Sequence, residues 1–125
     1  MTNKKFKRGQ IWEIDLSPTL GKEINTPKKS RPCLILSCTN VNSRGMIFIA
    51  PITQGNGCID DNNKLSVTLM GSGSKTMGKV LLNQCRFLDI SARGNRFIET
   101  IDDGIVKECL DILYVLLDIE FNENN

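Results

Sequence analysis

The residues that could perform chemistry are limited first by an absence, because the 125-residue chain contains no histidine. Serine–histidine–aspartate triads, cysteine–histidine pairs, HExxH zinc sites and the two-histidine type of ribonuclease all require an imidazole ring. The sequence therefore excludes all of these catalytic arrangements.

Cysteine is the next reactive residue type. The five cysteines are odd in number, show no CxxC spacing and lie largely in segments typical of apolar strand or helix; they are Cys33, Cys38, Cys58, Cys85 and Cys109. We therefore predict reduced, mostly buried thiols in a cytosolic protein, with no metal and no cofactor. A metal site or a disulfide framework is the less favoured alternative.

A glycine-rich stretch, Gly71-Ser-Gly-Ser-Lys-Thr76, invites comparison with a phosphate-binding loop. That loop needs two glycines five residues apart with a lysine directly after the second, and this stretch does not meet the requirement. The favoured interpretation is a hairpin connection, and the alternative is that Lys75 contacts a backbone phosphate.

Charge is segregated along the chain, although the net charge is only +2. Residues 1–31 carry a net charge of +5 and residues 32–98 a net charge of +4, whereas residues 99–125 carry −7. A basic body with an acidic end favours a surface that faces a polyanion, and a separate solvated face. The N-terminal lysines are also explained as a soluble leader.

Apolar periodicity predicts the elements that must position these residues. Strand length and pattern occur in about five stretches, which are 8–16, 32–37, 46–52, 65–69 and 79–82. Turn-forming residues predict loops at 17–30, 39–45, 54–63 and 71–76. Three- and four-residue apolar spacing predicts an amphipathic helix from about residue 102 to 119, before a frayed tail at 122–125.

These elements predict a mainly β fold, a small partly open β-barrel closed by a C-terminal helix. With 125 residues, 40% hydrophobic and 24% charged, the chain suits one domain over residues 1–125. It contains no apolar run of membrane-spanning length and no signal-peptide pattern, so we expect a cytoplasmic protein.

Five short strings occur in order along the chain. They are Arg8-Gly-Gln-Ile-Trp12, Ser17-Pro-Thr-Leu-Gly-Lys-Glu23, Ser30-Arg-Pro-Cys-Leu-Ile-Leu-Ser37, Ala50-Pro-Ile-Thr-Gln54 and Leu82-Asn-Gln-Cys-Arg-Phe-Leu-Asp89. In this order they resemble the MazF/PemK family of toxin endoribonucleases, including its ChpB-like branch. They correspond to the family's first strand, its first loop, the Arg-Pro start of the second strand, the Pro-x-Thr end of the third strand and the late Asp-Gln segment. The resemblance covers about residues 7–119.

The resemblance implies an SH3-like, partly open barrel of the MazF/PemK/CcdB type that forms a homodimer. It also implies the toxin of a type II toxin–antitoxin system, which cleaves single-stranded RNA, expected to be mRNA, at specific sequences without a metal ion. A cognate antitoxin with an acidic, disordered segment would inhibit it.

Two departures from the family pattern affect the mechanism. PemK-like members often carry a histidine before the glutamate of the first loop, where this chain has Lys22. They also place an arginine two residues before the late aspartate, and here these positions are Leu81 and Asn83. A mechanism that requires the arginine–aspartate pair is therefore excluded.

The resemblance then assigns catalysis to Arg31, Thr53 and Glu23. The planar guanidinium of Arg31 suits the phosphoryl oxygens, where negative charge develops. The Thr53 hydroxyl would contact a phosphate oxygen, and Glu23 would take or orient the proton of the ribose 2′-hydroxyl. On local grounds alone, the favoured explanations are a surface ion-pair residue for Arg31, a strand former for Thr53 and a solvated loop residue for Glu23.

Recognition of the RNA would use amides for the bases and lysines for the phosphates. On local grounds, each amide is more simply explained as a loop or turn residue. The candidate RNA-binding residues are Lys22, Lys28, Lys29, Gln54, Asn56, Lys75, Lys79, Asn83 and Gln84.

Two alternatives have the same fold and no enzymatic activity: a gyrase poison of the CcdB kind and a catalytically silent RNA-binding module. The CcdB-like alternative depends on a C-terminal tryptophan, whereas the single tryptophan of this chain is Trp12. A third alternative, an SH3-like adaptor, needs an aromatic groove, and aromatic residues make up only 6% of the chain.

Overall fold

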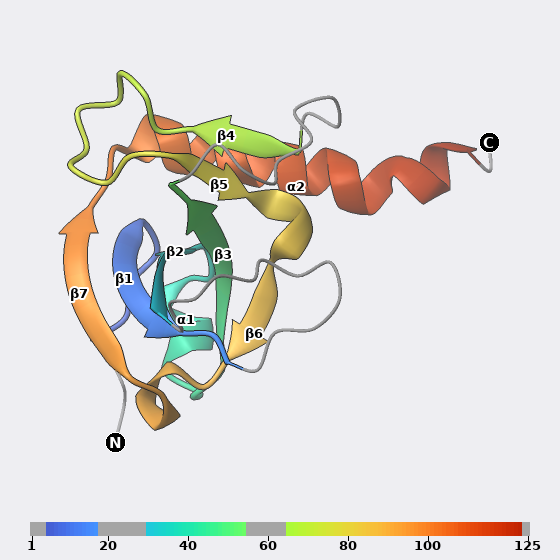
Figure 1. Cartoon of the computed structure of the whole chain (residues 1–125). Helices are drawn as coiled ribbons and strands as arrows, with labels where there is room; N and C mark the ends of the chain where they lie inside the picture. Colours follow the sequence, from blue (N-terminus) through green and yellow to red (C-terminus); the bar gives the residue numbers. More distant parts are fainter. Residues whose placement is uncertain (1–4, 18–29, 55–64, 124–125) are drawn as a thin grey trace.

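The computed structural model describes residues 5–17, 30–54 and 65–123 (Figure 1). These residues form seven β-strands, a short helix, two 3-10 helical turns and a long C-terminal helix. In chain order the elements are β1 Gln10–Asp15, β2 Ser30–Ile35, α1 Thr39–Asn42, β3 Ile47–Thr53, β4 Ser66–Thr68, β5 Lys79–Leu81, η2 Leu82–Gln84, β6 Arg86–Leu88, η3 Ile90–Ala92, β7 Asn95–Thr100 and α2 Asp103–Glu123.

Strand β3 is the centre of an antiparallel sheet with the order β4-β5-β3-β2-β1-β7. One edge of β3 pairs with β2, and its other edge pairs with β6 near its start and with β5 near its end. The strands curl into a barrel, and α2 runs behind β4 and β5 (Figure 1). No pairing joins β4 to β7 in the described part of the chain, so the barrel is partly open, as predicted.

The sheet buries apolar side chains on both faces, because successive residues of a strand point to opposite sides. The face that packs against α2, here called the helix face, includes Ile52 and Val80 together with Val106, Cys109 and Leu113 of the helix. The other face, here called the opposite face, is built from buried side chains of β1, β2, β3 and β6, of the η3 turn and of the chain on either side of β1. These are Phe6, Trp12, Ile14, Leu16, Cys33, Ile35, Ile47, Ile49, Leu88 and Ile90.

The five predicted strands and the C-terminal helix are confirmed, but the strand count was too low. Strands β6 and β7 were missed because the apolar residues of each, Phe87 and Leu88 in β6 and Phe97 and Ile98 in β7, are adjacent and show no alternation with polar residues. Helix α2 begins at Asp103 and runs to Glu123, so part of the predicted tail is helical.

The predicted loop 39–45 also contains the short helix α1, which sequence periodicity did not indicate. The fully buried Asn42 explains this helical turn. Its amide donates to the carbonyls of Phe6 and Ser37 at 3.0 and 2.9 Å, and its side-chain oxygen accepts from the Ser37 hydroxyl. One polar side chain thus fixes the turn that connects β2 to β3.

The four described cysteines are free, and Cys58 lies outside the described residues. Cys33 and Cys109 are buried, whereas Cys38 and Cys85 are half-buried. Burial raises the pKa of Cys85 and of Cys109 to about 12, so both thiols are protonated at neutral pH.

Candidate functional site

The structure brings Arg31 and Thr53 together on neighbouring strands. Strands β2 and β3 pair Cys33 with Pro51 and Ile35 with Ile49; Arg31 and Thr53 each lie two residues beyond the last of these pairs, at the same end, so their side chains share the face of Cys33 and Pro51. Opposite residues of an antiparallel pair point to the same face. The Arg31 Nη1 also donates to the carbonyl of Ile52 at 3.4 Å, which holds the guanidinium beside the end of β3.

A row is used here for residues that lie side by side on neighbouring strands, and the row of Arg31 and Thr53 continues across the sheet. Ile14 of β1 pairs with Arg31, and Lys79 of β5 pairs with Thr53. Because the fully buried Ile14 belongs to the opposite face, Arg31, Thr53 and Lys79 lie at the end of that face. The apolar face therefore ends in two cationic side chains with a nearly buried hydroxyl between them.

The backbone of Thr53 is fixed by a close approach of Gly78. Gly78 has a positive φ of 120°, and a Cβ atom at this position would lie 2.0 Å from the carbonyl oxygen of Thr53. The carbonyl of Gly78 in turn accepts from the amide of Leu69 at 2.8 Å. Only glycine fits here, so the β4–β5 hairpin supports the strand end that carries Thr53.

Lys75 lies in the same hairpin loop, but its backbone is anchored elsewhere. The Glu99 carboxylate accepts from the Lys75 amide at 3.0 Å and from the Thr76 amide and hydroxyl at 2.6 Å each. Desolvation raises the pKa of Glu99, but the hydrogen bonds from Thr76 and Lys75 outweigh it and hold this pKa below its usual value. Glu99 pairs with Ile11, three residues along β1 from the partner of Arg31, so Lys75 is not part of the Arg31 row.

The remaining candidate amides lie around β5 and the end of β3. Gln54 is exposed and directly follows Thr53. Asn83 is exposed and Gln84 is half-buried in η2, the turn between β5 and β6. The other candidates lie outside the described residues; these are Lys22, Glu23, Lys28, Lys29 and Asn56.

Arg86 is a cationic residue of this face that the sequence reasoning missed. It pairs with Ile49, so its side chain shares the opposite face with Arg31 from the other edge of β3. Burial raises the pKa of the Cys33 thiol, whereas the positive charges of Arg31 and Arg86 act in the opposite direction. Arg31 on β2 and Arg86 on β6 thus lie on the face that contains the buried Cys33. The sequence signal that could have found Arg86 is its spacing of two residues from Leu88, because residues two apart in a strand share a face and Leu88 is buried.

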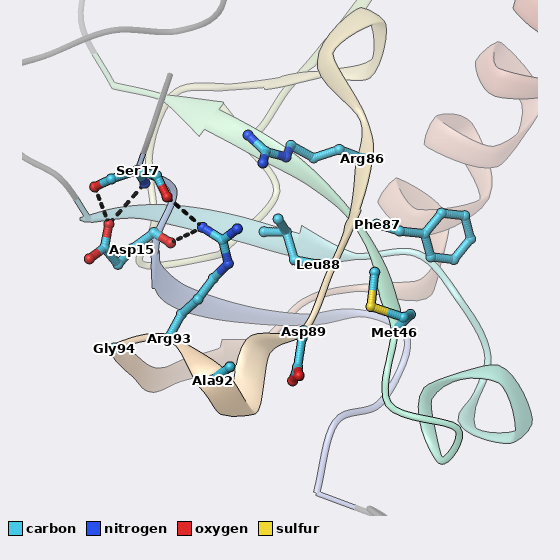
Figure 2. A pocket seen from close by; sticks show the side chains of 10 residues that line it. All are labelled: Asp15, Ser17, Met46, Arg86, Phe87, Leu88, Asp89, Ala92, Arg93 and Gly94. Atoms are coloured by element: carbon cyan, nitrogen blue, oxygen red, sulfur yellow. Dashed lines mark hydrogen bonds between the residues drawn. The ribbon is translucent and has the colours of Figure 1, made fainter. Parts of the chain in front are cut away.

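A pocket of about 580 Å³ lies next to Arg86. It is bounded by the end of β1, by β6 and by the η3 turn, and Figure 2 shows the Arg86 guanidinium extending toward Ser17 and Asp15, away from the Phe87 ring. The Arg93 Nη1 donates to the carbonyls of Asp15 and Ser17 at 2.9 Å each, which fixes the chain where the first loop begins.

Comparison with known proteins identifies the family. The model of the family described as "PemK-like, MazF-like toxin of type II toxin-antitoxin system" matches residues 7–117. The chain belongs to this family. It is therefore the toxin of a type II toxin–antitoxin system, as the resemblance implied.

Two curated relatives of this toxin come from Escherichia coli. Endoribonuclease PemK is 33% identical over 113 residues, which span 90% of this chain and 82% of PemK. Endoribonuclease toxin ChpB of strain K12 is 37% identical over 106 residues, which span 85% of this chain and 89% of ChpB.

Solved structures share the fold of the toxin at lower identity. MazF from Deinococcus radiodurans matches with a TM-score of 0.74 and 23% identity, covering 94% of this chain and 97% of that chain. A mycobacterial endoribonuclease in complex with its cognate antitoxin matches with a TM-score of 0.66 and 19% identity, covering 89% and 93%. The SH3-like toxin fold is thus confirmed.

Two further observations concern residues 5–17, 30–54 and 65–123 of the toxin. No three His, Cys, Asp or Glu side chains of these ranges are grouped closely enough to hold a metal ion. None of the helices in these ranges is long and apolar enough to cross a membrane.

Proposed function

We propose that this toxin is a sequence-specific endoribonuclease that cleaves single-stranded RNA, expected to be mRNA, in the cytoplasm. The observation that carries the proposal is that Arg31 and Thr53 lie at the same end of the β2–β3 pair, with the Arg31 guanidinium hydrogen-bonded to the carbonyl of Ile52, the residue before Thr53. The names of the relatives PemK and ChpB support the reaction class.

The reaction uses a nucleophile that the RNA itself contains. The ribose 2′-hydroxyl next to the scissile phosphate loses its proton and attacks phosphorus, while the bond to the 5′-oxygen breaks and that oxygen takes up a proton. The products are a 2′,3′-cyclic phosphate and a 5′-hydroxyl. No metal ion is required to generate the nucleophile, because it is held beside the phosphorus atom by the chain of the substrate.

Arg31 supplies the positive charge that this reaction needs. Its guanidinium keeps its charge at all physiological pH values and presents two parallel N–H groups to two phosphoryl oxygens. The Thr53 hydroxyl, on the neighbouring strand β3, donates to a phosphate oxygen. Glu23, which lies outside the described residues, is the proposed group that takes or orients the 2′-hydroxyl proton.

Binding of the RNA is assigned to the lysines and amides around this pair. Lys79 lies in the row of Arg31 and Thr53, and Gln54 directly follows Thr53. The other proposed RNA-binding residues are Lys22, Lys28, Lys29, Asn56, Lys75, Asn83 and Gln84.

We also propose that the toxin is a homodimer whose RNA-binding surface is blocked by an acidic, disordered segment of its antitoxin. The excess of positive charge over residues 1–98 supports this partner, since a surface that attracts phosphates also attracts carboxylates. Light scattering should give about twice the chain mass of 14.0 kDa. A mass near that of one chain would contradict the dimer.

The proposed reaction is tested by incubating the toxin with a long single-stranded RNA in excess EDTA. The expected result is cleavage at a short recurring sequence, with 5′-hydroxyl ends and 2′,3′-cyclic phosphate or 3′-phosphate ends. A duplex of the same sequence is the control and should resist cleavage. Products with 5′-phosphates, or activity that EDTA abolishes, would contradict the mechanism.

A non-enzymatic toxin of the same fold predicts a different outcome of this experiment. A gyrase poison of the CcdB kind leaves the RNA intact, and a silent RNA-binding module binds the RNA without cutting it. Either result would replace the proposed reaction.

A further inference from the structure

The sheet of the toxin leaves its two end strands unpaired with each other. Strand β4 lies at one end of the strand order and β7 at the other, and no pairing joins them within residues 5–17, 30–54 and 65–123. This boundary is here called the seam. The loop between β4 and β5, residues 69–78 and here called the hairpin loop, extends toward the end of β7 and so crosses the seam (Figure 1).

The Glu99 carboxylate binds the hairpin loop from the β7 side of the seam. It accepts from the amide of Lys75 at 3.0 Å and from the amide and the hydroxyl of Thr76 at 2.6 Å each. Thr76 is only 5% exposed, and the backbone of Glu99 is fixed by the pairing of β7 with β1. One carboxylate thus connects the loop to a strand with which neither β4 nor β5 pairs.

The hairpin loop is also tied together internally. The Ser72 hydroxyl donates to the carbonyl of Leu69 at 2.7 Å, and its oxygen accepts from the Ser74 amide at 3.3 Å. The Ser74 hydroxyl donates to the carbonyl of Thr76 at 2.8 Å. The Leu69 amide closes the loop by donating to the carbonyl of Gly78 at 2.8 Å. These bonds restrain the loop to move as one unit.

The far end of the hairpin loop lies against the strand end that carries Thr53. Gly78 follows Thr76 by two residues, and a Cβ atom on it would lie 2.0 Å from the carbonyl oxygen of Thr53 and 3.1 Å from the Cα of Gln54. Lys79, the next residue, pairs with Thr53. A displacement of the loop at Thr76 therefore shifts the backbone that packs against Thr53.

We propose that Glu99 is a positioning residue for RNA cleavage, which fixes the Thr53 hydroxyl relative to Arg31 by holding the hairpin loop across the seam. The assignment rests on the proposed endoribonuclease function. Glu99 acts through the loop and through Gly78 rather than on the RNA itself. Its loss should therefore slow the chemical step more than it weakens binding of the RNA.

The first test separates chemistry from binding. Glu99→Gln keeps the size of the side chain and removes one of its two acceptor oxygens. With saturating RNA, kcat per folded molecule should fall about 3- to 10-fold, which is less than for Thr53→Val, because the hydroxyl is displaced rather than removed. The Kd is measured on an RNA made resistant by a 2′-deoxy substitution at the attacking ribose, and it should stay within about threefold of the wild-type value.

The matched control is Asp111→Asn, which also converts a carboxylate to an amide. Asp111 is exposed on α2, where it forms an ion pair with Lys107 at 3.1 Å. This variant should change neither kcat nor Kd.

The second test asks whether Glu99 acts through Thr53. Glu99→Gln is combined with Thr53→Val, in which there is no hydroxyl left to position. In that background Glu99→Gln should lower kcat by less than about twofold, because the two residues act on one interaction. A merely structural role would slow the wild type and Thr53→Val by the same factor.

The loop side of the contact gives an independent pair of variants. Thr76→Val keeps the shape of the side chain and removes the hydroxyl that donates to Glu99, so it should also lower kcat. Thr76→Ser keeps that hydroxyl and should cleave near the wild-type rate. If Glu99→Gln does not fold, these two variants decide, since equal rates for both would contradict the assignment.

A third measurement needs no RNA. The backbone amide resonances of Thr53 and Gln54 report the place of the end of β3, and they should shift in Glu99→Gln and in Thr76→Val. In Asp111→Asn they should stay where they are in the wild type.

The outcomes separate this assignment from the function on which it rests. A wild-type toxin that cleaves no RNA overturns the proposed function and, with it, the role of Glu99 in catalysis. If the wild type cleaves RNA, three results overturn the role of Glu99 alone. These are a wild-type kcat in Glu99→Gln, equal losses in the two Thr53 backgrounds, and unmoved resonances at the end of β3. A raised Kd with unchanged kcat would do the same, because it would assign Glu99 to binding.

Discussion

The two faces of the central sheet end in different ways, although the same strands build both. On the helix face, apolar side chains of β3 and β5 meet apolar side chains of α2, so burial is completed within the chain. On the opposite face, the apolar rows end in Arg31, Thr53 and Lys79, with Arg86 on a neighbouring strand. Both faces bury apolar side chains and both therefore contribute stability, whereas the candidate chemistry lies only at the end of the opposite face, here called the rim, which is formed by Arg31, Thr53 and Lys79.

Ile52 and Thr53 provide the sharpest form of this comparison, because they are adjacent on β3 and point to opposite faces. Ile52 is fully buried in the helix face. Ile52→Ala should lower the free energy of unfolding by about 2–5 kcal/mol, because it removes buried methyl groups and leaves a cavity. The rate of RNA cleavage per folded molecule should stay near that of the wild type.

The measurement is urea unfolding together with an activity assay in which the folded fraction is known. Thr53→Val is the matched variant, since it keeps the shape of the side chain and removes the hydroxyl. Loss of the hydroxyl should change stability by about 0.5–1.5 kcal/mol and lower the rate roughly 10- to 100-fold. If Ile52→Ala lost activity without losing stability, the division between the two faces would be wrong.

Two glycines of the β4–β5 hairpin test how firmly this hairpin holds the end of β3 that carries Thr53. Gly71 and Gly78 both have positive φ, but a Cβ at Gly71 meets no atom within 4 Å, whereas one at Gly78 overlaps the Thr53 carbonyl. Gly71→Ala should cost about 1–2 kcal/mol of stability through backbone strain alone, with little loss of activity. Gly78→Ala should cost more than Gly71→Ala and should lower kcat, because the backbone at Thr53 must move.

Thermal unfolding and single-turnover cleavage measure the two effects separately. Equal losses in the two glycine variants would show that the hairpin does not support Thr53.

How much of this arrangement follows from the sequence differs between the two faces. The helix face was predictable, because the strands of residues 46–52 and 79–82 and the helix from 102 carry long apolar patterns. The rim was predictable only through the family strings, since an arginine before a proline and a threonine at a strand end are common on their own. Arg86 was missed because Phe87 and Leu88 are adjacent and give β6 no alternating pattern, and because its partner Ile49 is 37 positions away in the sequence.

The smallest predicted effect concerns Glu99, which holds the hairpin loop to β7. Its pKa is lowered in the folded toxin, so its contribution to stability is present above the pKa of the unfolded chain and is lost as pH falls through the folded pKa. Glu99→Gln should cost about 0.2–1 kcal/mol at neutral pH, because water screens this partly exposed carboxylate.

The difference in stability between the wild type and Glu99→Gln should shrink as pH falls below the usual range for a glutamate. Chemical unfolding at several pH values measures it, and Lys107→Gln, which removes an exposed ion pair within α2, serves as a control at another surface site. A difference that grows at low pH would contradict the assigned hydrogen bonds.

The most direct test of the central claim, that Arg31 and Thr53 act on one phosphate, is a double-mutant cycle on single-turnover cleavage of RNA in EDTA. Arg31→Lys should lose about 100- to 1,000-fold in rate while the protein stays folded, and Arg44→Lys, an exposed control, should lose none. The double variant Arg31→Lys/Thr53→Val should lose far less than the product of the two single losses, because both side chains stabilise the same transition state. Full multiplication of the two losses, or single variants that cleave at the wild-type rate, would contradict the account.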